Sequence, residues 1–173
     1  MVAATERRSA RSLSAFFAGL QAGMLGVWCM LAWLGMSAVW QRLSFWTSEN
    51  LMATVFYGNA ALRGGFASST VSGLALYVFL YSLLGAGFSM AVGDRVPRSR
   101  VALLSIALAL CWYYFAFHLV ARAVSPLVAL LHAERPMVFG HVLYGALLAR
   151  FPRYLPRAAP VPQEILVPEP PEQ

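Results

Sequence analysis

Long runs without a charged residue dominate the chain, and clusters of arginine separate them. These uncharged runs cover residues 12–41, 64–93, 101–121 and 136–149. A helix needs about 20 residues to cross the hydrocarbon of a bilayer, so the first three runs are long enough. The fourth run spans about 21 Å at about 1.5 Å per residue. It can still cross if Arg150 extends toward the interface and the bilayer thins locally.

The pattern therefore predicts an all-α membrane protein, a bundle of four transmembrane helices. Their expected ranges are 13–39, 67–92, 101–122 and 136–150. Small residues at four-residue spacing allow close helix packing in lipid. The series Gly19, Gly23 and Gly26 predicts which face of the first helix turns inward. Gln21 is the one amide within 13–39, and we expect it to hydrogen-bond to a neighbouring helix, because an unpaired amide in hydrocarbon costs several kcal/mol.

The connection between the first two predicted membrane helices is too apolar for a free loop. Residues 47–58 predict a short helix, for which Thr47 or Ser48 is a suitable N-cap. Four apolar residues share one face of it: Leu51, Met52, Val55 and Phe56. We interpret this segment as an interfacial helix on the outer surface. It serves either as a lid on the bundle or as a docking surface for a partner. Residues 123–135 predict a second outer interfacial segment.

The distribution of arginine predicts the topology. All 13 basic residues are arginines. With a cytoplasmic N-terminus, nine lie inside: Arg7, Arg8, Arg11, Arg95, Arg98, Arg100, Arg150, Arg153 and Arg157. Four lie outside: Arg42, Arg63, Arg122 and Arg135. Because cytoplasmic loops carry the excess of basic residues, both termini are expected in the cytoplasm. Residues 1–12 then form a basic N-terminal segment, and residues 151–173 form an extended, Pro-rich cytoplasmic tail.

Composition agrees with this picture and narrows the class of protein. The chain has 173 residues, of which 60% are hydrophobic and 12% charged, whereas a soluble domain is about 45–50% apolar and about 25% charged. This excludes a soluble enzyme, a disordered chain and a nucleic-acid-binding module. The net charge of +6 is explained by the topology signals. We expect the lipid bilayer of an inner or plasma membrane as the surroundings, other membrane subunits as partners, and no nucleic acid.

Motifs for catalysis are missing from the sequence. There is no phosphate-binding loop, no nucleophile elbow and no zinc-protease motif. The seven acidic residues lie outside the deep parts of the predicted helices. Cys29 and Cys111 are expected to be small buried hydrophobic residues. No metal site is expected, since Cys111 lies about two helical turns from His118. We therefore expect a protein that is not an enzyme.

Two histidines are the residues that could carry chemistry. His118 and His141 both lie about 7 Å below the outer interface on antiparallel helices, by their distance from Arg122 and Arg135. Ionisable groups inside a membrane are costly, which makes them functional candidates. One hypothesis is bis-imidazole binding of haem b, with Arg122 near a propionate. The alternatives are a quinone or lipid-headgroup pocket, or plain interhelical hydrogen bonds. The candidate cofactor-binding residues are His118, His141, Arg122, Tyr114 and Tyr144.

The favoured function is a structural or accessory subunit of a larger membrane complex. It follows from the small size, the aromatic outer connection and the absence of catalytic motifs. A haem b- or quinone-associated electron-transfer anchor that uses His118 and His141 is the first alternative. A small-solute transporter or channel is the second, although the sequence shows no repeated halves and no matched broken helices.

Overall fold

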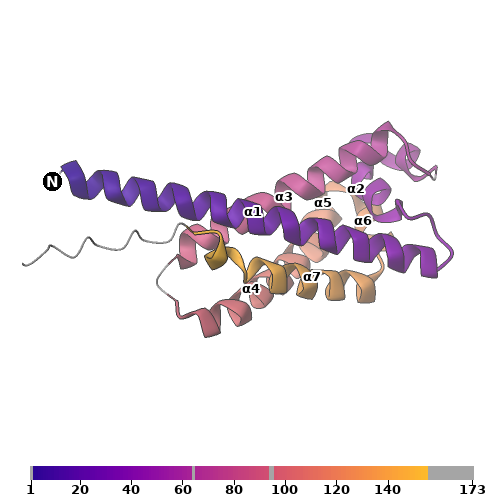
Figure 1. The fold of residues 1–173 in the computed structure, drawn as a ribbon. Helices are drawn as coiled ribbons and strands as arrows, with labels where there is room; N and C mark the ends of the chain where they lie inside the picture. The colour runs from indigo at the N-terminus through magenta and orange to yellow at the C-terminus, as the bar shows by residue number, and fades with distance from the viewer. Residues whose placement is uncertain (1, 64, 94–95, 156–173) are drawn as a thin grey trace, which may run out of the picture.

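The computed structural model describes residues 2–63, 65–93 and 96–155, and every regular element in these ranges is helical. α1 (Val2–Trp40) runs along the whole molecule, and α2 (Thr47–Tyr57) folds back at its far end (Figure 1). The 3-10 turn η1 (Gly58–Leu62) leads into α3 (Ser68–Val92), which returns antiparallel to α1. The remaining elements are α4 (Arg98–Tyr113), η2 (Tyr114–Val120), α5 (Ala121–Val124), α6 (Pro126–Leu131), α7 (Glu134–Leu148) and η3 (Phe151–Arg153).

Three helical segments are long and apolar enough to cross a membrane: Ser9–Trp40, Ser68–Val92 and Arg98–Val124. They coincide closely with the first three predicted membrane helices. The fourth predicted helix corresponds to α7, which has 15 residues, fewer than a full crossing of average hydrocarbon needs. At its N-terminal end α1 is longer than predicted and continues through the basic segment from Val2. Alanine, glutamate and arginine in this segment are good helix formers, which explains the extension.

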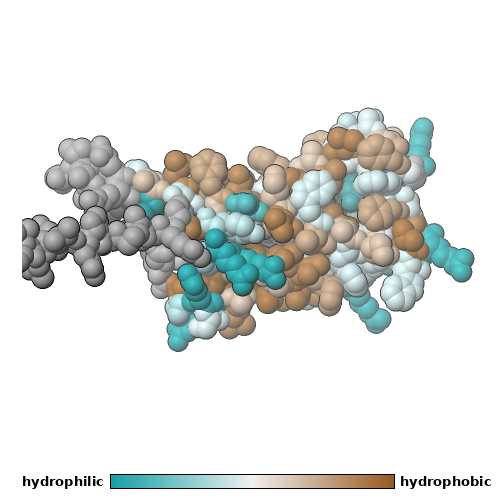
Figure 2. Space-filling model, in the orientation of Figure 1, coloured by the Kyte–Doolittle hydropathy of each residue, from teal (hydrophilic) through white to brown (hydrophobic). Residues whose placement is uncertain are grey.

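The exterior of the molecule carries many large apolar side chains, and the apolar core also encloses several polar ones. The largest fully buried side chains include four tyrosines and one histidine: Tyr77, Tyr81, Tyr113, Tyr144 and His141. Large apolar side chains lie outside, for example Leu103 at 72% exposure and Phe79 at 63%. In Figure 2 apolar side chains cover the middle of the molecule, and hydrophilic ones lie mainly toward its ends. This is the arrangement expected of a chain whose surroundings are hydrocarbon.

The glycines place α3 and α7 directly against α1. A Cβ atom added at Gly85 would lie 2.6 Å from the carbonyl oxygen of Gly19 and 2.9 Å from Cα of Gly23, so α1 and α3 touch through their backbones. Gly26 lies under the ring of Tyr144, and α7 contacts α4 at Gly145 in the same close manner. The predicted inward face of α1 is therefore confirmed.

The expectation that Gln21 hydrogen-bonds to a neighbouring helix is wrong. Its side chain is exposed on the surface of α1. It lies on the side of α1 opposite the inward glycines. The position of Gln21 along the axis of the bundle explains why an exposed amide is tolerated there. Gly26 packs on Tyr144 of the antiparallel α7, and Gln21 and Arg150 lie about the same distance, about 8–9 Å, toward the N-terminal end from that contact. Gln21 is thus level with a charged residue that belongs at the headgroups.

The expectation that both cysteines are buried is also wrong. Both cysteines are free thiols, but Cys111 is exposed on α4 and Cys29 is half-buried, whereas burial was predicted for both. α4 packs mainly on α7, so most of its circumference remains open. Apolar residues on that open side face the surroundings of the protein instead of a core.

α2 forms where a helix was predicted, but its buried face differs. Glu49, Asn50 and Thr54 are buried, while Phe56 of the predicted apolar face is 59% exposed. The reason is the surface that α2 meets. It packs on the polar first turns of α3, so its polar residues turn inward together with Leu51 of the predicted apolar face, while Phe56 turns outward. α6 lies within the predicted segment 123–135.

The predicted tail begins later than expected. Phe151 is fully buried and lies in η3, which packs on α1. An edge-to-face contact with Phe88, with ring centroids 5.8 Å apart, fixes it against α3. The chain therefore stays attached to the bundle beyond residue 150. Residues 156–173 of the predicted tail lie outside the described residues.

Substitution Gly85→Ala tests the contact between α1 and α3. We expect it to lower the free energy of unfolding by about 1–3 kcal/mol, because the added methyl group meets backbone atoms that cannot rotate away. Gly87→Ala is the matched control, since an added Cβ there meets nothing within 4 Å. Unfolding of both variants in mixed micelles measures the difference, and equal stabilities would contradict the packing described.

Candidate metal centre

His141 is the centre of a buried hydrogen-bond network between α3 and α7. Its Nδ1 lies 2.7 Å from the carbonyl oxygen of Met137. A carbonyl oxygen only accepts, so Nδ1 carries the proton and Nε2 accepts the hydrogen bond of the Tyr81 hydroxyl at 2.6 Å. The hydroxyl of Tyr144 donates to the carbonyl oxygen of Tyr81, also at 2.6 Å. These bonds connect α3 and α7 in the interior of the bundle.

The arrangement separates the two histidines of the haem hypothesis. Both ring nitrogens of His141 are engaged, and the residue is fully buried. Tyr113 contacts both imidazoles, with its ring centroid 5.6 Å from that of His118 and 5.1 Å from that of His141. His141 thus has no open nitrogen to offer an iron. Its bonds match the interhelical alternative that the sequence left open.

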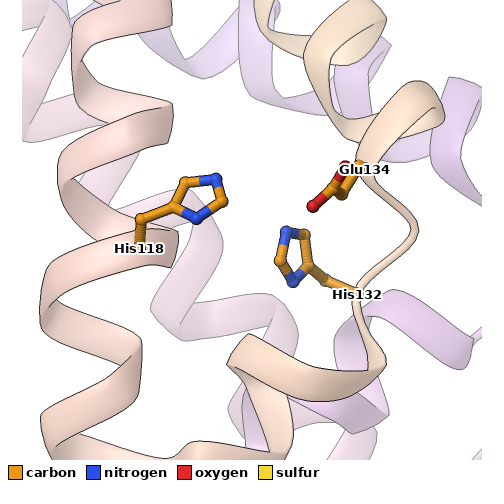
Figure 3. A group of neighbouring side chains, drawn as sticks. All are labelled: His118, His132 and Glu134. Carbon is orange, nitrogen blue, oxygen red and sulfur yellow. The ribbon is translucent and has the colours of Figure 1, made fainter.

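A second group of polar side chains gathers at the end of the bundle where α4 and α7 meet α6. His118, His132 and Glu134 place one ligand atom each within 4.8 Å of one another. In Figure 3 the three side chains point toward a common space. His118 comes from η2, His132 follows α6, and Glu134 begins α7. Three separate segments of the chain therefore meet at one point.

The local helix geometry contributes to the position of His118. η2 is a stretch of π-helix that continues α4 without a break and contains His118 near its end. Each turn of a π-helix holds more residues than an α-turn, and such bulges are frequent at functional sites. The ring of Tyr114 stacks on His118 at a centroid distance of 5.3 Å. This contact restricts the orientation of the imidazole.

His132 is oriented in the manner of a metal ligand. Its Nδ1 donates to the carbonyl oxygens of Val128 and Ala129, at 3.0 and 3.1 Å. Metal-binding histidines commonly donate the other ring N–H to a backbone carbonyl in this way, which fixes the tautomer. Nε2 is then the unprotonated nitrogen. It accepts a hydrogen bond from the Tyr113 hydroxyl at 3.3 Å, a longer contact than the 2.6 Å bond on His141, and this hydroxyl has to turn away when Nε2 binds a cation. The nitrogen that can bind a cation therefore belongs to the group in Figure 3.

The two imidazoles and one carboxylate of this group favour a transition-metal ion. Imidazole nitrogen suits zinc, copper, iron and nickel, while magnesium and calcium prefer ligands that are all oxygen. Three protein ligands leave at least one position open for water or a substrate. Both histidines are half-buried and Glu134 is exposed, so an ion can reach the site from the end of the bundle.

The predicted candidate residues divide between the two groups and the surface. His118 and Tyr114 lie together at the metal group, and His141 and Tyr144 each hydrogen-bond to Tyr81 in the core. Arg122 is exposed on α5 and has no ion pair among the described residues. The expectation of no metal site considered Cys111 and did not consider His132.

Four residues of the two groups were not predicted from the sequence: His132, Glu134, Tyr113 and Tyr81. One signal was present for two of them, because the His-x-Glu spacing lies between two apolar segments, where charged groups are few. Tyr113 and Tyr81 had no such signal. A tyrosine in an apolar helix looks the same whether its hydroxyl meets a histidine or the interface.

No protein-family model, no curated protein and no solved structure matches this chain.

Substitution Tyr81→Phe tests the buried network. It removes the donor to His141 and leaves a buried Nε2 without a partner, which costs about 1–3 kcal/mol of stability. The exposed Tyr114 provides the matched control, since Tyr114→Phe keeps the ring stacking on His118 and should change stability by less than about 0.5 kcal/mol. Denaturation in mixed micelles would measure both, and an unchanged Tyr81→Phe protein would refute the bond.

Proposed function

We propose that this protein is a small integral membrane protein that binds a divalent transition-metal ion, with Zn²⁺ the first candidate. The observation that supports the proposal is the convergence of His118, His132 and Glu134 within 4.8 Å. The backbone-anchored tautomer of His132 supports it further, because the unprotonated Nε2 is the form that a metal needs. Neutral histidine and carboxylate together favour zinc over magnesium.

The proposal includes the topology expected from arginine. α7 serves as a short fourth crossing between Arg135 and Arg150, and both termini lie in the cytoplasm of an inner or plasma membrane. The metal group then lies on the extracytoplasmic side, since it is at the opposite end of the bundle from the start of α1 (Figure 1). α2 is placed at the outer interface with Phe56 and Tyr57 directed outward. The ion would enter from the extracytoplasmic solution.

We further propose an accessory role in a larger membrane complex. The segment Arg98–Val124 supports this role. In its most apolar stretch 22% of the residues are buried inside the bundle, whereas the corresponding share for Ser9–Trp40 is 50%. Its open side is available to another membrane subunit. A metal ion at its outer end would clamp η2 to the connection between α6 and α7 and hold that side rigid. The protein would then act as a metal-bound structural component.

The two alternatives have less support. A haem or quinone anchor loses its second histidine ligand, because both nitrogens of His141 are hydrogen-bonded. For a transporter, the cavity beside His132 has a volume of about 50 Å³, enough for water or an ion. No specific observation favours either alternative over the metal-binding protein.

Metal binding is tested with the purified protein in detergent after treatment with a chelator. Titration with Co²⁺ should give visible absorption bands of a bound ion, and Zn²⁺ should displace them. We expect His118→Ala, His132→Ala and Glu134→Gln each to weaken binding at least about tenfold, because each removes a ligand. Arg135→Gln is the matched control next to Glu134 and should not weaken it.

The same titration can contradict the proposal. An absence of Co²⁺ bands in the wild-type protein would remove the metal function. Bands that persist unchanged in both histidine variants would place the ion elsewhere. A rise in melting temperature with added Zn²⁺, absent in His132→Ala, is the independent check, since an ion that binds only the folded state stabilises it.

A further inference from the structure

Glu49 is a buried carboxyl group that the metal group does not use. It lies in the first turn of α2 and is 1% exposed. Its Oε2 has no hydrogen-bond partner among the described residues. Ser82 Oγ is the other buried atom of this kind, but a neutral hydroxyl costs far less to bury than a charged carboxylate. Glu49 is therefore the exceptional polar group of the interior.

Among the described residues, no positive charge compensates Glu49. On α3 the titratable neighbour is Tyr77, a phenol that carries no positive charge in either protonation state. The described parts of α1 near α2, as well as η1 and α6, contribute no acidic or basic side chain to this contact. Arg42 and Arg63 are exposed, and neither forms an ion pair with Glu49. Burial accordingly raises the pKa of Glu49 from 4.5 to about 7.

We propose that Glu49 is a proton-binding site, and that its proton is required for α2 to dock on α3. In the docked position one oxygen of the carboxyl group is enclosed without a hydrogen-bond partner, so the group is more stable there as the neutral acid. When the proton leaves, the charge needs water, and α2 separates from α3 to provide it. The proposal does not depend on the metal site.

The backbone contact explains why the whole helix has to move. The carbonyl oxygen of Glu49 lies directly against Gly73, with no room there for even a Cβ atom. A side-chain rotation alone leaves this contact closed. The remaining polar links of α2 to its neighbours are few. Thr70 donates to Asn50, and Tyr57 shares a 3.1 Å hydrogen bond with Ser72 at the exposed end of the contact. Asn50 donates to the carbonyl oxygen of Gly65, and Thr54 shares a 2.8 Å hydrogen bond with Ser125 just before α6.

The direction of the pH effect follows from the two protonation states. The pKa of Glu49 is higher in the docked state than in the open, hydrated state, so the docked state binds the proton more tightly. Docking is fully favoured below about pH 4.5 and weakens as pH rises to about 7. Between these limits the docking equilibrium changes by up to about tenfold per pH unit.

Hydrogen exchange of the full-length protein in detergent tests the proposal, with chelator present throughout. Protection factors, corrected for the intrinsic effect of pH on exchange, are measured for α2 and α7 between pH 5 and 8. We expect the protection of α2 to fall tens of fold over this range while that of α7 stays constant. In Glu49→Gln, which is neutral at every pH, the protection of α2 should be independent of pH.

Arg63→Gln is the matched control, because it removes an exposed charge that follows η1 and should keep the pH dependence of the wild-type protein. Protection of α2 that does not vary with pH in the wild-type protein would overturn the proposal. So would a Glu49→Gln protein with the wild-type pH dependence, or a parallel loss of protection in α7. If Glu49→Gln does not fold, the comparison of α2 with α7 in the wild-type protein decides alone.

Discussion

Hydrocarbon surroundings impose one requirement on this chain: polar groups must find their partners inside the bundle. The interior meets it with side chains that a soluble core rarely concentrates. Tyr81 donates to His141, and Tyr144 donates to the carbonyl oxygen of Tyr81. Ser89 does the same across the α1–α3 contact by donating to the carbonyl oxygen of Ala15. These bonds and the glycine contacts replace the exclusion of water as the source of helix association.

At the end of the bundle opposite the start of α1, polar groups are less completely buried. The chain from η2 to the start of α7 changes direction several times within a short distance, and each change leaves polar groups near the surface. His118, His132 and Glu134 meet there, half-buried or exposed, and so remain available to a cation. α2 closes the neighbouring side with Glu49 enclosed beneath it. An ion and a proton are the two ligands that these groups can bind with the geometry in place.

The uncharged runs and the positions of arginine could predict the long helices, because both patterns reflect which parts of the chain face hydrocarbon and which face water. The first three long helices and α2 lie where uncharged runs and turn residues predicted them, and the inward face of Gly19 and Gly23 followed from spacing. The π-type stretch η2 has no signal in composition, so the position of His118 could not be derived. His141 was found, but its partner Tyr81 lies 60 residues away in the chain. Contacts between residues so far apart in the chain depend on how whole helices pack. The spacing of residues within one helix carries no information about this packing.

The central claim is that the apolar exterior of α3 and α4 faces lipid. Spin labels on single cysteines at Phe79 and Leu103, in a background without Cys29 and Cys111, test it in lipid vesicles. The account predicts high collision rates with oxygen, which concentrates in hydrocarbon, and low rates with a water-soluble nickel complex. Labels at both positions that collide freely with the nickel complex and little with oxygen would contradict it.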